Sequence, residues 1–159
     1  MADEFGFVVK VSGVEDAAAE LRALTPKLRK RAILNALRAG ARVVREEVRR
    51  LTPVLAVPVR RKGRLIRKPG TVRQAVSVRT SKTSARAGNL GVFVNVRPAK
   101  GGNVGKFNPF DPFYWRFLLR GRFGAALRGG AGKLIEAKAK IEATLGPAIE
   151  RLNRKGAQP

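Results

Sequence analysis

The residue types that carry most enzyme chemistry are scarce in this sequence. Its 159 residues include no histidine, no cysteine and only 11 acidic residues. Zinc fingers, thiol or histidine nucleophiles, haem ligand pairs and disulfides are therefore excluded, and any metal would need oxygen ligands. The candidate acid–base pair is Glu46 and Glu47, but neighbours on a helix point about 100° apart and do not converge on one site. We therefore predict no catalytic residues, no metal site, no cofactor and no enzyme activity.

Two glycine-rich stretches that end in lysine, residues 101–106 and 129–133, invite comparison with phosphate-binding loops. A P-loop needs a glycine five places before its Gly-Lys pair and a serine or threonine after it. The residues at these positions are Lys100 and Phe107 in the first stretch and Leu127 and Leu134 in the second. We therefore interpret both stretches as flexible loops.

Positive charge is concentrated in the middle of the chain. The sequence has 34 Lys and Arg residues, a formal net charge of +23 and a pI near 11.9. Residues 48–135 hold 20 of these basic residues and one acid, Asp111, while the hydrophobic content of 44% is normal for a globular protein. A folded chain with such a block has three interpretations: a surface for nucleic acid, a surface for an acidic protein, or a solvated face with counterions.

The densest part of the basic block is residues 54–70, which also contain Pro58, Gly63, Pro69 and Gly70. We predict a long basic loop or a β-ribbon arm here. The predicted contacts for DNA or an acidic partner are Arg60, Arg61, Lys62, Arg64, Arg67, Lys68 and Arg73.

Six of the ten aromatic residues lie between Phe107 and Phe117, close to Arg116 and Arg120. Aromatic rings beside arginine can stack on single-stranded nucleic acid. We favour the interpretation that they are core or subunit-interface anchors, because large apolar side chains with arginine at the rim are typical of such contacts. The predicted interface residues are Phe110, Phe113, Tyr114, Trp115 and Phe117.

Hydrophobic periodicity predicts the elements in the first half of the chain. A period-two pattern predicts a strand over Phe5–Val11, and a helical pattern follows from Val14 to about Thr25-Pro26. A longer helix then runs to about Leu51, where Thr52-Pro53 ends it. Strands are predicted over residues 72–80 and 90–97, joined by a polar, flexible link from Ser81 to Asn89.

Glycine and proline divide the second half. Residues 98–111 are predicted to be a loop, and Asp111-Pro112 to begin a short helix. Residues 121–132 contain five glycines and are expected to be mobile or extended. A last helix is predicted from Lys133 to about Lys155, kinked or divided at Pro147, with a flexible tail over residues 156–159.

These elements predict a single α+β domain over residues 1–159: a small antiparallel sheet of three or four strands, covered on one face by the long helix and the C-terminal helix, with long basic loops. The start of the chain is acidic and nowhere do 18 apolar residues follow one another, so we predict neither a secretory signal nor a membrane span.

Four short motifs carry a resemblance that spans most of the chain. They are Ala36–Ala41 in the long helix, Thr52-Pro53 at its end, Pro69–Val76 at a strand entry, and Phe113–Leu118 in the aromatic box. In this order they resemble the tail-component proteins of tailed bacteriophages, also called tail-completion or head–tail joining (neck) proteins. The sequence departs from that pattern after the aromatic box, before the last helix, and in the length of its basic loop.

The resemblance implies a structural function with no chemistry. It implies a protomer of a sixfold homo-oligomeric ring in the neck or tail of the virion, assembled in the cytoplasm of the bacterial host, with DNA passing through its centre. The implied partners are a connector, a tail terminator or a tail tube, and genomic DNA. The charge leaves one alternative open, a basic nucleic-acid-binding protein of ribosomal or nucleoid type.

Overall fold

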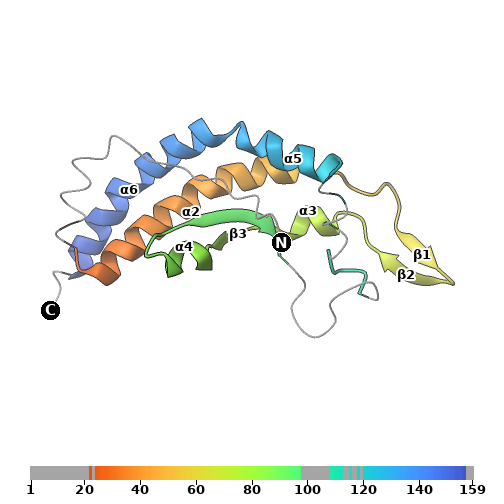
Figure 1. Ribbon diagram of the computed structural model, residues 1–159, viewed down its shortest axis with the longest axis horizontal. Helices are drawn as coiled ribbons and strands as arrows, with labels where there is room; N and C mark the ends of the chain where they lie inside the picture. The colour runs from red at the N-terminus through yellow and green to blue at the C-terminus, as the bar shows by residue number, and fades with distance from the viewer. Residues whose placement is uncertain are drawn as a thin grey trace. The chain divides into compact units, whose positions relative to one another are not determined.

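The computed structural model describes residues 22, 24–97, 108–112, 115, 118 and 120–156. Their elements, shown in Figure 1, are helix α2 (Pro26–Leu51), strands β1 (Val59–Arg61) and β2 (Arg64–Arg67), helix α3 (Thr71–Ala75), strand β3 (Val76–Thr80), helix α4 (Lys82–Arg86), strand β4 (Val92–Val96), and helices α5 (Arg122–Ala131) and α6 (Leu134–Gly156). The strands form two small antiparallel sheets, β1–β2 and β3–β4. The α+β class is confirmed. The strand predicted over Phe5–Val11 lies outside the described residues, as does most of the first predicted helix.

The chain divides into two compact units, which we describe separately. Unit 1 contains the described residues of Met1–Val44, Val78–Phe93 and Lys133–Pro159. Unit 2 contains Arg45–Ser77 and the described residues of Val94–Gly132. The assignment of residues 1–159 to a single domain stays a prediction.

Helix α2 has the predicted C-terminal end. Its buried residues recur every four positions at Ala32, Ala36, Gly40, Val44 and Val48, which is the spacing of one helix face. After Leu51 the Thr52 hydroxyl donates to the Val48 carbonyl at 2.6 Å, and the Thr52 N–H donates to the same oxygen at 2.9 Å. Pro53 then prevents continuation, because the residue before a proline is displaced from the helical region.

The core of unit 1 lies between α2 and α6. Its buried cluster consists of Leu24, Ala32, Ala36, Ile141, Leu145, Ile149 and Leu152. Gly40 of α2 permits a close approach, because a Cβ at this position would lie 2.5 Å from Ile141 Cγ1 and 2.6 Å from the Ala137 carbonyl oxygen. Helix α6 passes through Pro147 without being divided.

The core of unit 2 is built mainly from valines and from α5. Its buried hydrophobic residues are Val48, Val72, Val76, Val94, Val96, Phe123, Ala126 and Leu127. The Trp115 ring packs edge-on against Phe123, with 6.0 Å between ring centroids. Position 129 also requires glycine for packing, since a Cβ there would lie 2.3 Å from Leu51 Cδ1.

One predicted strand was wrong in its first four residues, and two predicted loops were wrong. Residues 72–75 belong to helix α3 rather than a strand, because Gly70 turns the chain with φ 75° and its carbonyl accepts from the Gln74 N–H at 2.9 Å. The strand therefore begins at Val76. The link from Ser81 to Asn89 was predicted to be flexible but contains α4, whose first turn is capped by the Ser81 hydroxyl accepting from the Ser84 N–H at 3.1 Å.

The second wrong loop is the glycine-rich stretch 121–132, most of which forms α5 instead of a mobile or extended segment. Its buried residues Phe123, Ala126, Leu127 and Gly130 have helical spacing, so burial of this face outweighs the low helix propensity of glycine. Of the predicted loop over residues 98–111, residues 98–107 lie outside the described part of the chain.

Candidate functional site

The basic arm, residues 54–70, contains the β-ribbon that was one of its two predicted forms. Strands β1 and β2 pair antiparallel, with Arg60 opposite Leu65 and Arg61 opposite Arg64. The two residues between them, Lys62 and Gly63, have φ values of 48° and 73°. Positive φ at both central residues is the requirement of a type I′ turn, whose twist matches that of paired strands. The arm therefore contains a β-hairpin with a two-residue turn. In Figure 1 this hairpin extends past α3, which belongs to the same unit.

The tip of the arm presents cations to solvent. Arg60, Arg61, Lys62 and Arg64 are all exposed, whereas Leu65 and Ile66 of β2 are half-buried. Arg60 donates to the Gly63 carbonyl at 3.3 Å across the turn. The arm contains six basic residues and no acid, so its tip is a concentrated positive charge that no acid within residues 54–70 neutralises.

The base of the arm is held against residues 108–112. The Lys68 N–H donates to the Pro109 carbonyl at 3.2 Å, and the Thr71 hydroxyl donates to the Lys68 carbonyl at 2.8 Å. The Lys68 ammonium also lies over the Phe110 ring, 5.2 Å from its centroid, which is a cation–π distance. One predicted cation and one predicted interface aromatic residue thus meet at the base of the arm.

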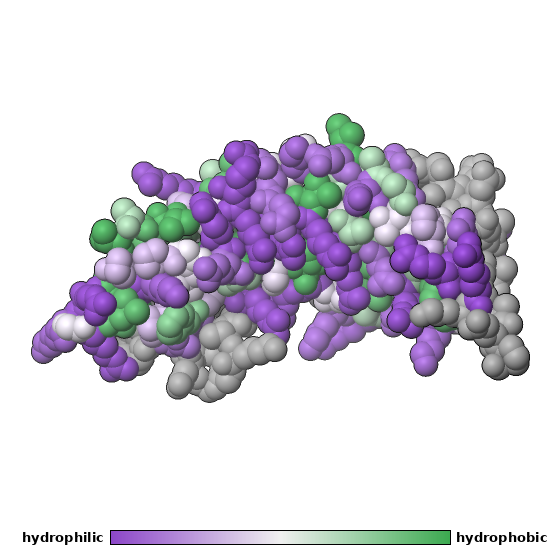
Figure 2. Space-filling model, turned by 180° about the vertical axis from the view of Figure 1, so that it is seen from behind, coloured by the Kyte–Doolittle hydropathy of each residue, from purple (hydrophilic) through white to green (hydrophobic). Residues whose placement is uncertain are grey.

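Exposed apolar side chains accompany this base. They form a set, here called the apolar set, of Val54 at 42% exposure, Val57 at 68%, Val59 at 39% and Phe110 at 58%. Val59 begins β1 and pairs with Arg67, the residue before Lys68, so Val59 lies at the base of the arm, where Phe110 also contacts Lys68. Figure 2 shows apolar surface beside hydrophilic surface at the hairpin end of unit 2.

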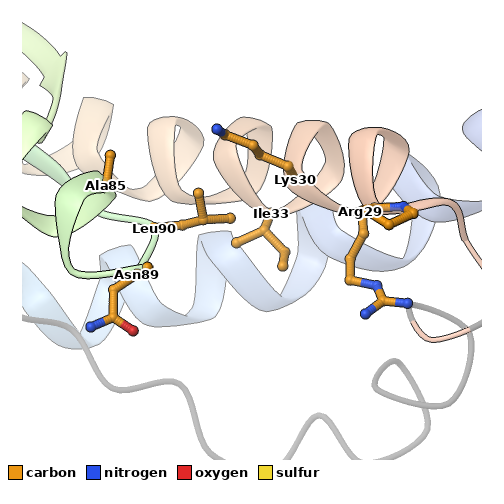
Figure 3. A pocket seen from close by; sticks show the side chains of 8 residues that line it. Arg29, Lys30, Ile33, Ala85, Asn89 and Leu90 are labelled. Atoms are coloured by element: carbon orange, nitrogen blue, oxygen red, sulfur yellow. The ribbon is translucent and has the colours of Figure 1, made fainter.

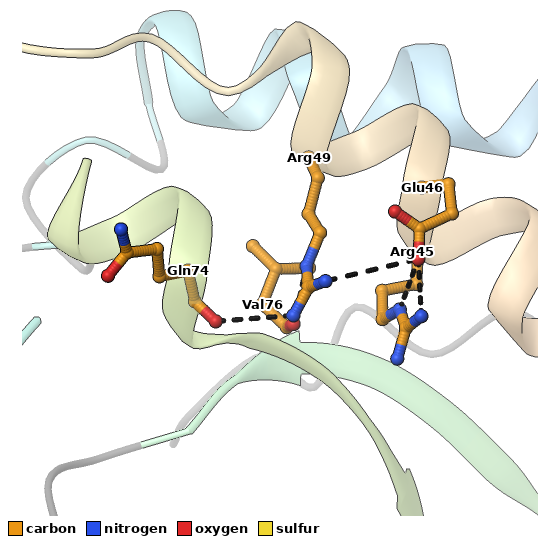
Figure 4. Close-up of polar contacts among 5 residues, drawn as sticks. All are labelled: Arg45, Glu46, Arg49, Gln74 and Val76. Atoms are coloured by element: carbon orange, nitrogen blue, oxygen red, sulfur yellow. Dashed lines mark hydrogen bonds and ion pairs between the residues drawn. The ribbon is translucent and has the colours of Figure 1, made fainter.

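Two arginines, Arg49 and Arg73, bind backbone carbonyls near the end of α2, and Figure 4 shows the first of them. Arg49 donates through Nε to the Val76 carbonyl at 3.1 Å and through a terminal nitrogen to the Gln74 carbonyl at 3.2 Å. Arg73, which was predicted to contact DNA or an acidic partner, donates to the Thr52 carbonyl at 2.8 and 3.2 Å. Arg49 was not singled out from the sequence, because its helical position is that of an ordinary solvated arginine.

Both members of the candidate acid–base pair, Glu46 and Glu47, form ion pairs with arginines of α2. Glu46 accepts from Arg45 and lies 3.9 Å from Arg49, while Glu47 accepts from Arg50 at 2.6 and 2.9 Å. The hydrogen bond and charge of Glu47 raise the pKa of Arg50 above its ordinary value. Each carboxylate serves a different arginine, in agreement with the inference that the two do not converge on one site.

The predicted aromatic anchors are only partly described. Trp115 is half-buried and contacts Phe123 of its own unit, whereas Phe110 is exposed at the base of the arm. Phe113, Tyr114 and Phe117 lie outside the described residues. Their role at a subunit interface stays a prediction.

A shallow pocket of about 340 Å³ lies in unit 1, beside the first turns of α2. Figure 3 shows Ile33 facing Leu90 and Asn89 of the segment that follows α4, with Arg29 and Lys30 nearby. None of the eight lining residues carries a carboxyl, hydroxyl or thiol group, so the pocket offers cations and apolar contact but no nucleophile or general acid.

Among the described residues no three acidic side chains come together in a way that could hold a metal ion. No described helix has the length and apolarity that a membrane crossing requires.

The fold and its surface define a small α+β protein that offers partners a basic β-hairpin with apolar residues at its base. A family model described as "Bacteriophage HK97-gp10, putative tail-component" matches residues 15–119, about two thirds of the chain. The chain belongs to this HK97-gp10-like family, so the resemblance found in the sequence is confirmed. No curated protein and no solved structure matches it. Membership suggests a structural, non-enzymatic role in the virion, in association with other phage tail or neck proteins.

Proposed function

We propose that this tail component is the protomer of a sixfold ring that completes the tail or joins it to the head connector. The observation that carries the proposal is the arm itself, which combines exposed cations with an exposed apolar set. A ring protomer needs a patch that binds a different patch on its neighbour, because such head-to-tail contacts form a ring when the rotation from one copy to the next closes. Apolar residues surrounded by arginine are typical of the centre of such contacts.

In this proposal the ring lies in the neck or tail, with genomic DNA passing through its centre. The arm contacts either this DNA or the acidic face of an adjoining protein, such as the connector, the tail terminator or the tail tube. Either contact is consistent with six cations on residues 54–70 and with an arm that has no acid. Assembly takes place in the cytoplasm of the bacterial host.

The test images the purified full-length protein alone and after mixing with connector and tail-tube proteins of the same phage. We expect rings by electron microscopy and their incorporation at one end of the tail. A protein that remains a monodisperse monomer and never joins a tail contradicts the proposal. Tight, steeply salt-sensitive binding of duplex DNA by that monomer would support the ribosomal or nucleoid alternative instead.

A charge-matched pair of variants shows whether the arm is the active surface. The arm variant carries Arg60→Gln, Arg61→Gln and Arg64→Gln, and the control variant carries Lys27→Gln, Arg31→Gln and Arg42→Gln on exposed positions of α2. Both lose three positive charges. We expect the arm variant alone to lose tail joining, whereas equal losses in both variants would show that only the total charge matters.

A further inference from the structure

The arm as described lacks the third layer or strand that would stabilise it. It has two strands, and a two-stranded hairpin is marginally stable in water without further packing. Leu65 and Ile66 are only half-buried, and Val57 remains 68% exposed just before β1. A partner that covers these side chains must itself bring apolar surface. The phosphate backbone of DNA matches the arginines but not the valines, because its contacts are polar and charged.

One segment of the same sequence has the complementary chemistry. Residues 1–20 contain five acids and one lysine, which gives a net charge of −4, whereas the rest of the chain has 33 basic and 6 acidic residues. The segment also carries apolar residues at alternating positions, from Phe5 to Val11, the pattern from which a strand was predicted. No other part of the chain combines a clear negative charge with alternating apolar residues.

We propose that the basic arm of one copy binds residues 1–20 of a neighbouring copy. The acids Asp3, Glu4, Glu15, Asp16 and Glu20 pair with the arginines of the hairpin, and the apolar residues of the segment cover Val57, Val59 and Phe110. Each copy carries one arm and one acidic segment, so the contact is heterologous and repeats from copy to copy. The inference deepens the proposed ring function by naming its subunit contact, and it assigns the arm to a neighbouring copy in place of DNA or an adjoining protein. It rests on the proposed function only for closure of the ring.

The test uses charge reversal in the full-length protein. Variant A carries Arg60→Glu, Arg61→Glu and Arg64→Glu, and variant B carries Asp3→Lys, Glu4→Lys and Glu15→Lys. Self-association is measured by sedimentation velocity at low and moderate salt. We expect each variant alone to associate at least about tenfold more weakly than wild type, since like charges then face each other. A control with Lys27→Glu, Arg31→Glu and Arg42→Glu changes the same charge on α2 and should associate like wild type.

Mixing separates a contact between copies from a contact within one copy. In an equimolar mixture the reversed arm of A meets the reversed segment of B, and the native arm of B meets the native segment of A. We expect association to return to within about threefold of wild type, with A and B alternating. A mixture that stays dissociated overturns the inference, as does an arm that folds onto the acidic segment of its own copy.

The remaining outcomes distinguish this inference from the proposed function. If variant A forms rings as well as the wild-type protein does, the arm contact is overturned but the proposed ring is not. A wild-type protein that never self-associates yet joins tails also overturns the contact while it supports a tail component. Duplex DNA that binds wild type and not variant A, with association unaffected, assigns the arm to DNA.

Discussion

At the scale of single residues, the arginines of this protein divide into those that serve the fold and those that are offered to partners. Thr52 is 1% exposed, so its carbonyl needs a hydrogen-bond donor, which Arg73 supplies. Arg49 donates likewise to the carbonyls of Gln74 in α3 and Val76 at the start of β3. Within the described part of the chain, the arginines at the tip of the arm donate no hydrogen bond to a buried carbonyl. A charge count from the sequence therefore overstates how many cations a partner can bind.

Arg49→Met tests the structural role of the first group. The substitution keeps much of the aliphatic stem but removes the donors to the Val76 and Gln74 carbonyls, so we expect a loss of about 1 to 3 kcal/mol in the free energy of unfolding. Urea denaturation measures it. The control, Arg154→Met in α6, removes only an ion pair with Glu150 whose two side chains are 83% and 64% exposed, and should leave the urea midpoint unchanged. Equal midpoints for both variants would refute the structural role of Arg49.

Gly40→Ala tests the close approach of α2 and α6. In an open helix position alanine is about 1 kcal/mol better than glycine. Here the new Cβ would lie 2.6 Å from the Ala137 carbonyl oxygen, a backbone atom that cannot turn away. We expect a net loss of about 1 to 3 kcal/mol, measured as a lower thermal midpoint. A midpoint at or above that of wild type would show that the helices can separate without cost.

The control for this prediction is Gly146→Ala in α6, where a Cβ meets no atom within 4 Å. The gain in helix propensity is offset because residue 147 is a proline, which disfavours a helical conformation for a preceding residue with a Cβ. We therefore expect a change of less than about 0.5 kcal/mol.

At the scale of elements, the two long helices were predictable because their apolar residues repeat over many turns. The period of apolar residues predicted the course of α6, and the same period together with Thr52-Pro53 predicted the end of α2 at Leu51. Short elements carry too few repeats for such an inference. Helices α3 and α4 have five residues each and depend on single contacts, the Gly70 turn and the Ser81 cap. The sequence shows both residues, but not that they start helices.

Glycine misled the prediction of α5 for a physical reason. Glycine lowers helix propensity, yet it also lets neighbouring side chains approach a helix closely. In unit 2 the second effect decides, since Gly124 and Gly130 are buried and Gly129 lies against Leu51. The helical spacing of Phe123, Ala126 and Leu127 was the signal in the sequence that could have revealed the helix.

The turn of the arm gives a prediction at the same scale. Gly63 has φ 73° and no atom near its missing Cβ, so Gly63→Ala should cost about 1 kcal/mol through backbone strain alone. Lys62 has φ 48°, a conformation that asparagine tolerates better, so Lys62→Asn should stabilise the hairpin. Amide hydrogen exchange at Arg61 and Arg64 measures both effects. We expect exchange to be faster than in wild type for Gly63→Ala and slower than in wild type for Lys62→Asn. Unchanged exchange in both would contradict the type I′ turn.

At the scale of the whole molecule, the sequence predicted the arm but not its base. Charge density and the turn residues marked residues 54–70 as a basic loop or β-ribbon, and the structure selects the ribbon. The valines before β1 were not singled out, because their exposure depends on which surfaces the rest of unit 2 covers. The contact between Lys68 and Phe110 joins residues far apart in the sequence, so no local pattern predicts it.

Composition sets how the contacts of the arm respond to solution conditions. Histidine and cysteine are the side chains that ordinarily change charge near neutral pH, and the chain has neither. Contacts of the arm should therefore respond to salt, which screens exposed charges beyond about 10 Å at 0.1 M, and hardly at all to pH.

The double variant Arg61→His and Arg64→His makes this argument testable, because these residues face each other across the hairpin. Histidine is protonated below a pH of about 6.5, so the variant arm keeps its charge at pH 5.5 and loses two cations at pH 7.5. We expect wild-type self-association, measured by sedimentation, to change by less than about twofold between these pH values. The variant should associate at least about threefold more tightly at pH 5.5 than at pH 7.5, and moderate salt should abolish the difference. A variant as insensitive to pH as wild type would mean that the tip of the arm makes no charged contact between copies.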